Sequence, residues 1–256
     1  MTPRHMLSAA LVDDPARPLL TFYDDRTDER AELSVATFGN WVAKTANLLR
    51  DGLDARPGQR VALHLPVHWQ AAVWLSACWA AGLVAAPGAA DADITIIAAD
   101  DPASGPATFS GEVVALGLGP LGLPRRGAAP PTYALDYDRE IHAHGDHFVP
   151  EVPDDPDARA LETDGAVLTA GELGELTASA AARWALPPGA RILCAAPYGD
   201  VDSVLAGLLV PLGARCGAVL ARHLDEDKMR SRLPAEHITA GSGLGDAVLQ
   251  ALPRVT

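Results

Sequence analysis

The sequence predicts an α/β protein made of two similar halves, each with a mainly parallel sheet that is flanked by helices. Three observations indicate this fold class. Short β-branched runs alternate with longer apolar segments at helical spacing, which is typical of parallel sheets covered on both faces. The chain also repeats itself, since Arg60-Val-Ala-Leu-His-Leu-Pro66 matches Arg191-Ile-Leu-Cys-Ala-Ala-Pro197. Finally, 48% of the 256 residues are hydrophobic, which is enough to bury a core and excludes a disordered chain.

The first copy of the repeat begins with a predicted hairpin of two strands, at 19–23 and 31–33. Ser34 is placed to cap the helix that follows. The buried stripe of this helix recurs at helical spacing in Phe38, Trp41, Val42, Thr45, Leu48 and Leu49. Pro57-Gly58 then breaks the chain before a strand that starts at Val61. A second apolar helix and a strand at 84–86 complete the copy.

The second copy has the same order of elements. Strands at 160–162 and 166–168 form its hairpin, and a helix begins after Thr169. Thr169 and Glu172 have the spacing of a capping box, in which the hydroxyl and the carboxylate satisfy opposite backbone amides. Pro188-Gly189 precedes the strand that starts at Ile192. An apolar helix and a strand at 216–220 follow.

Several segments lie outside the repeat. The acidic, Pro-rich stretch 150–157 is the predicted joint between a first subdomain, 1–150, and a second, 151–256, which repeats 19–88. Residues 117–131 are rich in Gly and Pro and predict an irregular connection. The remaining elements are expected to be strands at 94–98, 113–116 and 237–240, and helices at 225–233 and 246–252.

Charge and cysteine usage narrow the class of protein. A formal net charge of −13 at pH 7 excludes a nucleic-acid or anionic-membrane partner, because phosphates would be repelled. Cys78, Cys194 and Cys216 lie in apolar runs, which indicates buried thiols in a reducing compartment. The N-terminus lacks the pattern of a signal peptide. The uncharged stretch 71–90 contains Gly and Pro, so a buried helix and strand explain it better than a membrane span. We therefore expect a soluble, cytoplasmic protein.

The order of these elements and their sequence motifs resemble the N-terminal domain of the adenylate-forming superfamily. This superfamily includes acyl-CoA synthetases, luciferases and nonribosomal adenylation domains. In the first copy the resemblance is carried by Thr37-Phe-Gly-Asn-Trp41, Pro57-Gly-Gln-Arg-Val-Ala62 and Trp79-Ala-Ala-Gly-Leu-Val-Ala-Ala-Pro87. In the second copy it is carried by Pro188-Gly-Ala-Arg-Ile-Leu-Cys-Ala-Ala-Pro197, the stretch 204–218 and Glu236-His-Ile-Thr239. The resemblance implies the α/β fold of an AMP-dependent synthetase or ligase and an acyl or nucleotide-like ligand.

The departures from that family concern its chemistry. The family has a Ser/Thr/Gly-rich loop ending in Pro-Lys-Gly, which cradles the ATP phosphates. Here the corresponding stretch is 161–168, where Asp164-Gly165 predicts a tight hairpin turn. The phosphate loop is thus expected to be deleted, and Asp164 would repel a triphosphate. Lysine occurs only at Lys44 and Lys228, and neither lies in a Gly-rich loop.

The resemblance also implies elements that lie beyond this chain. In the family, adenine-binding strands, a ribose-binding Asp and a C-terminal lid with the catalytic lysine follow. Since adenylyl transfer depends on positioning and charge stabilisation, we expect that this chain alone does not adenylate a substrate. No cofactor is expected, because the motifs do not support ATP and Mg²⁺.

Four residues are candidates for a ligand cleft. His64 and His68 flank Pro66 at the carboxyl end of a predicted strand, where open α/β sheets bind ligands. Tyr198 and Asp200 fall where the family has an aromatic-plus-His substrate motif. Helix capping or simple exposure is the competing structural explanation for these polar residues.

A second candidate site is the motif His142-Ala-His144-Gly-Asp146-His147. Its H-x-H-x-D-H spacing resembles the zinc signature of metallo-β-lactamase-type hydrolases, in which such ligands activate a bridging water. The context differs, because the motif follows a polar segment and runs into Phe148-Val-Pro150 rather than opening a helix. A polar surface loop is the competing interpretation, and zinc remains an alternative cofactor.

The sequence therefore predicts a degenerate adenylate-forming-like protein that acts as a binding, regulatory or scaffold protein. Its partner would be a small acyl- or nucleotide-like ligand or an unidentified protein. The alternative is an enzyme. It would be either an acyl-CoA synthetase-like activity completed by a partner chain, or a metal-dependent hydrolase that uses the His-rich loop.

Overall fold

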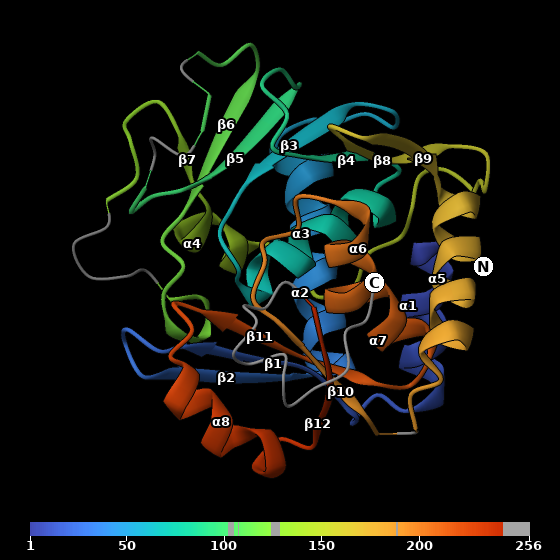
Figure 1. The fold of residues 1–256 in the computed structure, drawn as a ribbon. Helices are drawn as coiled ribbons and strands as arrows, with labels where there is room; N and C mark the ends of the chain where they lie inside the picture. The colour runs from blue at the N-terminus through green and yellow to red at the C-terminus, as the bar shows by residue number, and fades with distance from the viewer. Residues whose placement is uncertain (102–104, 107, 124–128, 188, 243–256) are drawn as a thin grey trace.

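Two mainly parallel sheets form the frame of the protein, with helices between them (Figure 1). The structure is a computed structural model that describes residues 1–101, 105–106, 108–123, 129–187 and 189–242. The predicted helix at 246–252 lies outside these residues. The larger sheet has the strand order β7 (Leu135–Asp136), β6 (Glu112–Leu116), β5 (Ile94–Ala98), β3 (Arg60–His64), β4 (Val84–Pro87), β8 (Arg159–Thr163) and β9 (Ala166–Thr169). The smaller sheet has the order β12 (Ile238–Ser242), β10 (Arg191–Cys194), β11 (Gly217–Arg222), β1 (Pro18–Asp24) and β2 (Glu29–Ser34).

Each half of the chain contributes a hairpin to the sheet of the other half. The first-half hairpin β1–β2 joins the smaller sheet, where β1 runs parallel to β11 with Leu20 opposite Ala218. The second-half hairpin β8–β9 joins the larger sheet, where Leu161 lies opposite Ala85 of β4. The division of the chain into subdomains 1–150 and 151–256 stays a prediction, but neither half completes its own sheet alone.

Two helices of the first half lie between the sheets, and their burial follows from their sequences (Figure 1). Ser34 caps α2 (Val35–Asn47) by accepting a hydrogen bond from the amide of Thr37. A π-helical turn, Leu48–Gly52, extends α2. The apolar helix α3 (Trp69–Ala80) is buried from Trp69 to Trp79. The stretch 71–90 is therefore a buried helix followed by β4, as expected, and no helix among the described residues is long and apolar enough to cross a membrane.

Three helical segments of the second half lie among the described residues. The predicted capping box of Thr169 and Glu172 is present at the start of α5 (Ala170–Trp184). The next helical segment runs through α6 (Val201–Val204), a π-helical turn at Leu205–Leu209 and α7 (Val210–Gly213). The helix α8 (Glu226–Ala235) covers the outer face of the smaller sheet, where Met229 is fully buried (Figure 1).

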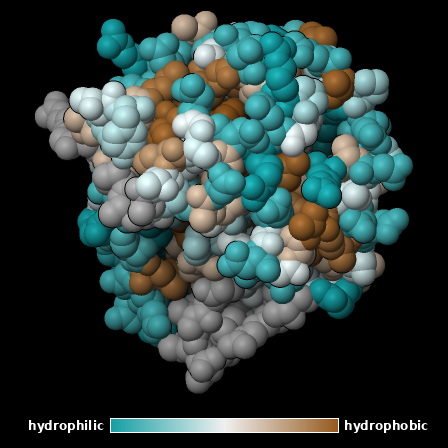
Figure 2. Space-filling view, turned by 90° about the horizontal axis from the view of Figure 1, so that it is seen from above, coloured by the Kyte–Doolittle hydropathy of each residue, from teal (hydrophilic) through white to brown (hydrophobic). Residues whose placement is uncertain are grey.

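The α-helices α1 (Pro3–Asp13) and α4 (Tyr137–Glu140) have no counterpart in the sequence-based expectations. The helix α1 is capped by Thr2 and buries Met6, Leu7 and Ala10 against the core. The short helix α4 follows β7 and buries Tyr137, whose hydroxyl lies 2.8 Å from that of Thr45. Seen from above, the surface is mainly hydrophilic, and hydrophobic residues gather in a few separate areas (Figure 2).

Candidate functional site

A pocket of about 320 Å³ opens where the carboxyl ends of strands from both sheets meet. Its walls follow β3, β4 and β5 of the larger sheet, and β10 and β11 of the smaller one. This is the edge at which open α/β sheets bind ligands, because side chains after each strand point into a common crevice. The lining consists of Leu63, His64, Leu65, Pro66, Ala71, Pro87, Gly88, Ala98, Asp101, Pro197, Tyr198, Gly199 and Arg222.

Most of this strand-end pocket is apolar, and its polar side chains are few. The ring Nε2 of His64 lies 2.9 Å from the carbonyl oxygen of Ala89. The Arg222 side chain is only 11% exposed, and its Nη2 lies 3.8 Å from Oδ2 of Asp100. Among the described residues, no hydrogen-bond partner lies within reach of its Nη1. The positive charge of Arg222 thus lies beside the carboxylate of Asp100, and Asp101 is a further acidic residue in the lining of the pocket.

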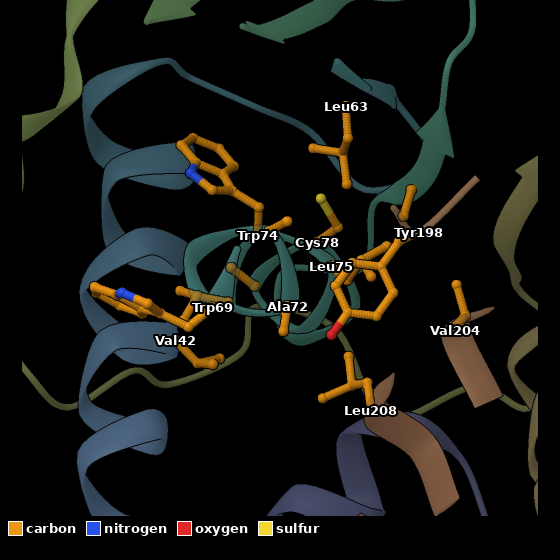
Figure 3. Packing of buried hydrophobic residues seen from close by; sticks show 14 of the residues in the cluster. Val42, Leu63, Trp69, Ala72, Trp74, Leu75, Cys78, Tyr198, Val204 and Leu208 are labelled. Carbon is orange, nitrogen blue, oxygen red and sulfur yellow. The ribbon is translucent and has the colours of Figure 1, made fainter. Parts of the chain in front are cut away.

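Tyr198 forms one wall of the pocket and is otherwise packed in the core (Figure 3). Its hydroxyl donates a hydrogen bond to the carbonyl oxygen of Gly207 over 3.1 Å. Burial raises the pKa of this hydroxyl well above its ordinary value. Tyr198 therefore stays a neutral hydrogen-bond donor and does not act as a base.

The structure brings together two of the four residues predicted for the cleft. His64 and Tyr198 both line the pocket. His68 is fully buried and caps α3, with its Nδ1 accepting from the amide of Gln70. Asp200 caps α6 by accepting from the amide of Ser203 over 2.7 Å. His68 and Asp200 thus have the capping role that was the competing explanation for them.

Two further polar residues of the pocket, Arg222 and Asp101, were not predicted as site residues. Arg222 is the last residue of β11, and Asp101 follows β5 by three positions. The strand-end rule that indicated His64 applies equally to both positions. No sequence motif marks these two strand ends.

The His-rich loop is held by backbone contacts to the first half of the chain. Lys44 donates to the carbonyl oxygen of His144 over 2.8 Å. Asn47 donates to the carbonyl oxygens of Gly145 and His147, each over 2.9 Å. The ring of His142 lies edge-on to Trp41, with 6.3 Å between centroids. In the part of the chain that the structure describes, no three His, Cys, Asp or Glu side chains are grouped to hold a metal ion.

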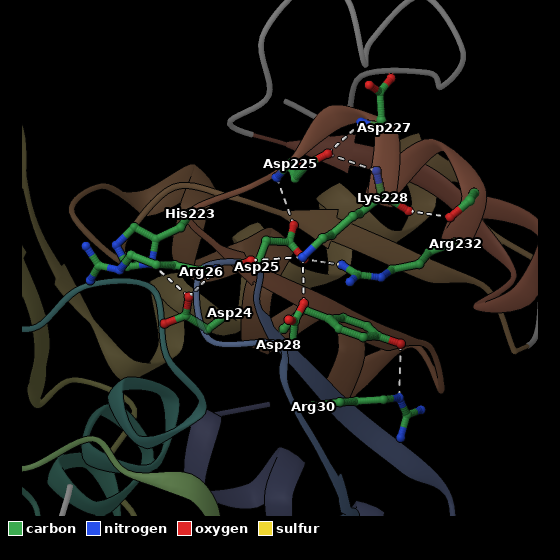
Figure 4. A network of polar contacts seen from close by, with 12 residues as sticks. Asp24, Asp25, Arg26, Asp28, Arg30, His223, Asp225, Asp227, Lys228 and Arg232 are labelled. Carbon is green, nitrogen blue, oxygen red and sulfur yellow. Dashed lines mark hydrogen bonds and ion pairs between the residues drawn. The ribbon is translucent and has the colours of Figure 1, made fainter. Parts of the chain in front are cut away.

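The second lysine and the buried thiols also have structural surroundings. Lys228 of α8 contacts Oδ1 of Asp28 at 2.5 Å and the carbonyl oxygen of Asp25 at 3.1 Å (Figure 4). Burial raises the pKa of Cys78, and it raises that of Cys194 to about 12. These two thiols are therefore not nucleophiles at neutral pH.

The predicted tight turn between β8 and β9 is present. Thr163 and Ala166 are a paired position of the hairpin, so only Asp164 and Gly165 connect the two strands. Neither residue has the positive φ that an Asp-Gly pair predicts, so this two-residue connection closes in another conformation. Asp164 is exposed at the tip.

A larger cavity, of about 710 Å³, lies at the amino-terminal ends of the strands of the larger sheet, near the starts of β4 and β8. The joint segment crosses it, and Arg4 donates to the carbonyl oxygen of Val152 over 3.1 Å. Arg4 also pairs with Asp154 at 3.3 Å. Since these polar groups hold the joint in place, we take the strand-end pocket as the candidate site.

The fold is similar to that of the N-terminal part of solved acyl-CoA synthetase chains. An acyl-CoA synthetase of Brucella canis superposes with a TM-score of 0.78 at 15% identity, covering 98% of this chain and 49% of that one. The N-terminal domain of FACL13 from Mycobacterium tuberculosis gives 0.71 at 17% identity, covering 94% and 62%. A structure of the ATP-bound RpMatB-BxBclM chimera B3 gives 0.68 at 17% identity, covering 94% and 49%. The chain thus spans about half to three fifths of these solved chains.

A relative identified by sequence matches this chain over nearly its whole length. A TIGR03089 family protein of Mycobacterium tuberculosis (strain ATCC 25618 / H37Rv) is 37% identical over 253 residues. The alignment covers 93% of this chain and 99% of that protein. No model of a protein family matches the sequence. At this identity and coverage, the chain belongs to the TIGR03089 family.

Proposed function

We propose that this protein uses the acyl-CoA synthetase-like fold to bind a small, mainly apolar ligand in the strand-end pocket, without adenylating it. The observation that carries the proposal is the β8–β9 hairpin. Two residues, Asp164 and Gly165, connect its strands, whereas the adenylate-forming superfamily that the sequence resembles has a longer phosphate-binding loop at this position. A two-residue turn offers too few backbone amides to surround a triphosphate.

Charge supports the same conclusion. Binding a nucleoside triphosphate requires cations or oriented amides to offset its negative charge. Both lysines are engaged elsewhere, Lys44 with the His-rich loop and Lys228 with Asp28. Arg222, a cation that lines the pocket, lies beside Asp100, and the acidic residue Asp101 lines the same pocket. The net charge of −13 adds a further unfavourable field.

The pocket itself suits a small ligand. Its volume of about 320 Å³ is at the lower end of the roughly 300–1,000 Å³ range of ligand sites. Leu63, Leu65, Pro87 and Ala98 supply apolar walls, and His64 with Arg222 supplies polar groups at fixed positions. A mainly apolar lining with a few placed polar groups is the usual composition of such a site.

Calorimetric titration with ATP and Mg²⁺ tests the proposal. We expect no heat of binding at millimolar nucleotide, and no pyrophosphate release with short carboxylic acids. An active acyl-CoA synthetase in the same buffer is the positive control. Micromolar affinity for ATP by the isolated chain would overturn the non-adenylating assignment.

A second candidate function follows from the coverage of the structural relatives. The solved acyl-CoA synthetase is about twice as long as the part that this chain matches, and one related chain is described as ATP bound. An adenylating activity completed by a partner chain is therefore the alternative. Pyrophosphate release that depends on a co-purified protein, and that is lost when this protein is separated from the chain, would favour this alternative.

A further inference from the structure

One side chain separates the strand-end pocket from the core behind it. Tyr198 lines the pocket, yet only 6% of the residue is exposed. On its other side the ring faces the helical segment 201–213, and its hydroxyl donates to Gly207. Figure 3 shows the ring among Ala72 and Leu75 of α3, and Val204 and Leu208 of the helical segment. The ring therefore fills the space into which the pocket would otherwise continue.

Gly207 fits this ring closely. A Cβ at Gly207 would lie 2.8 Å from Cε1 of Tyr198, which real Cβ contacts essentially never show, and a tight 3.1 Å from the hydroxyl oxygen of Tyr198. Gly207 also lies in the middle of the π-helical turn Leu205–Leu209. Such turns disturb the regular helical hydrogen bonds and are frequent at functional sites. The absence of a side chain at Gly207 and the carbonyl group of this turn together form the seat of the tyrosine ring.

We propose that Tyr198, seated against Gly207, is the specificity-determining residue that limits the depth of the strand-end pocket. The ligand is then a compact molecule with a short apolar part, and long unbranched chains are excluded. This inference rests on the proposed ligand-binding function. It adds a size limit and assigns that limit to one ring.

Straight-chain 1-alcohols from butanol to decanol are suitable probes, because they differ only in apolar length. Burial of each methylene adds about fourfold to affinity while the chain still fits. For the unaltered protein, we expect affinity to rise with length and then to stop rising at the limit set by Tyr198. In Tyr198→Leu the gain should continue for at least two further methylenes. Calorimetric titration of the whole chain measures both series.

Two control variants separate ring volume from other effects. Tyr198→Phe keeps the ring and loses the hydroxyl, so its length limit should equal that of the unaltered protein. Gly207→Ala pushes the ring from its seat toward the pocket, so its limit should move to shorter alcohols. Since Tyr198→Leu could destabilise the core, thermal unfolding confirms that each variant is folded. If the Leu variant is unfolded, the shift in Gly207→Ala decides the test.

The possible failures are distinguishable. An unchanged length limit in folded Tyr198→Leu, or in Gly207→Ala when that variant decides, overturns the role of Tyr198 and leaves ligand binding intact. If no protein of the series binds any alcohol, the proposed apolar binding site is itself overturned, and the size limit with it.

Discussion

The exchange of hairpins between the sheets makes a quantitative prediction for Phe22→Ala. Phe22 lies in β1, is fully buried, and meets the ring of His68 edge-on at 4.5 Å. Truncating a buried phenylalanine costs about 3–5 kcal/mol, and the lost ring contact favours the upper part of this range. This loss is a large part of a total stability of roughly 5–15 kcal/mol. In a chain of this size each kcal/mol shifts the melting temperature by about 2–4 °C, so we expect the melting temperature to fall by about 6–20 °C.

The informative measurement is which strands lose protection from hydrogen exchange in this variant. Although Phe22 belongs to the first half of the chain, its strand pairs with β11 of the second half. We expect urea unfolding to remain a single transition at a lower midpoint. Hydrogen exchange should accelerate together in peptides from β3 and β4 and in peptides from β10 and β11. Each sheet needs the hairpin of the other half, so the two sheets should lose protection as one unit.

Two further variants serve as a reciprocal test and as a control for this experiment. Leu161→Ala is the reciprocal change, since Leu161 is fully buried in β8 and lies opposite Ala85. It should cost about 2–5 kcal/mol and again affect both sheets. Val167→Ala, at a position that is 54% exposed in β9, should change stability by less than about 0.5 kcal/mol. Loss of protection in the smaller sheet alone after Phe22→Ala would refute the coupling of the two halves.

Three other predictions concern single groups. Burial raises the pKa of Asp138 to about 6, although its Oδ2 accepts a hydrogen bond from the amide of Gly117. Since this carboxyl titrates at lower pH in the unfolded chain, the free energy of unfolding should fall as pH rises through the range from about 4 to 6. In Asp138→Asn that slope should flatten, and an unchanged slope in urea titrations at several pH values would show that another group is responsible. Thr169→Ala removes the capping box of α5 and should cost about 1 kcal/mol in urea unfolding; a cost near zero would mean that packing alone holds the helix end. Elemental analysis of the purified protein should find no equimolar zinc, whereas equimolar zinc that disappears in His144→Ala would instead support the hydrolase alternative.

The sequence predicts the elements better than their pairing. The repeat, the capping residues Ser34 and Thr169, and both hairpins are found in the structure. Which sheet each hairpin enters is not predictable from periodicity, because hydrophobic patterning marks a strand as buried without naming its neighbour. The burial of β1 on both faces, from Leu19 to Asp24, fits a strand inside a sheet rather than at its edge.

The N-terminal helix α1 shows a different limit. Thr2 followed by Pro3 is a helix-start signal, and Met6, Leu7 and Ala10 have helical spacing. Only one turn of apolar contacts supports this pattern, so the local signal is weak without the core against which it packs.

The candidate site was predictable in part for a related reason. His64 and Tyr198 were indicated by a strand end and by a family motif, and both line the pocket. Polar residues at strand ends also cap helices, and His68 and Asp200 have that role. Which polar residues share a crevice depends on how the two sheets meet, and that arrangement is a property of the tertiary fold.

The strand-end pocket as the ligand site is tested most directly by mapping amide chemical shifts during a titration with 1-hexanol. We expect concentration-dependent shifts at His64, Gly88, Tyr198, Gly199 and Arg222, which line the pocket, and none at the turn of Asp164. Shifts confined to Gly58, Gly82 and the joint segment, which line the second cavity, would contradict this assignment.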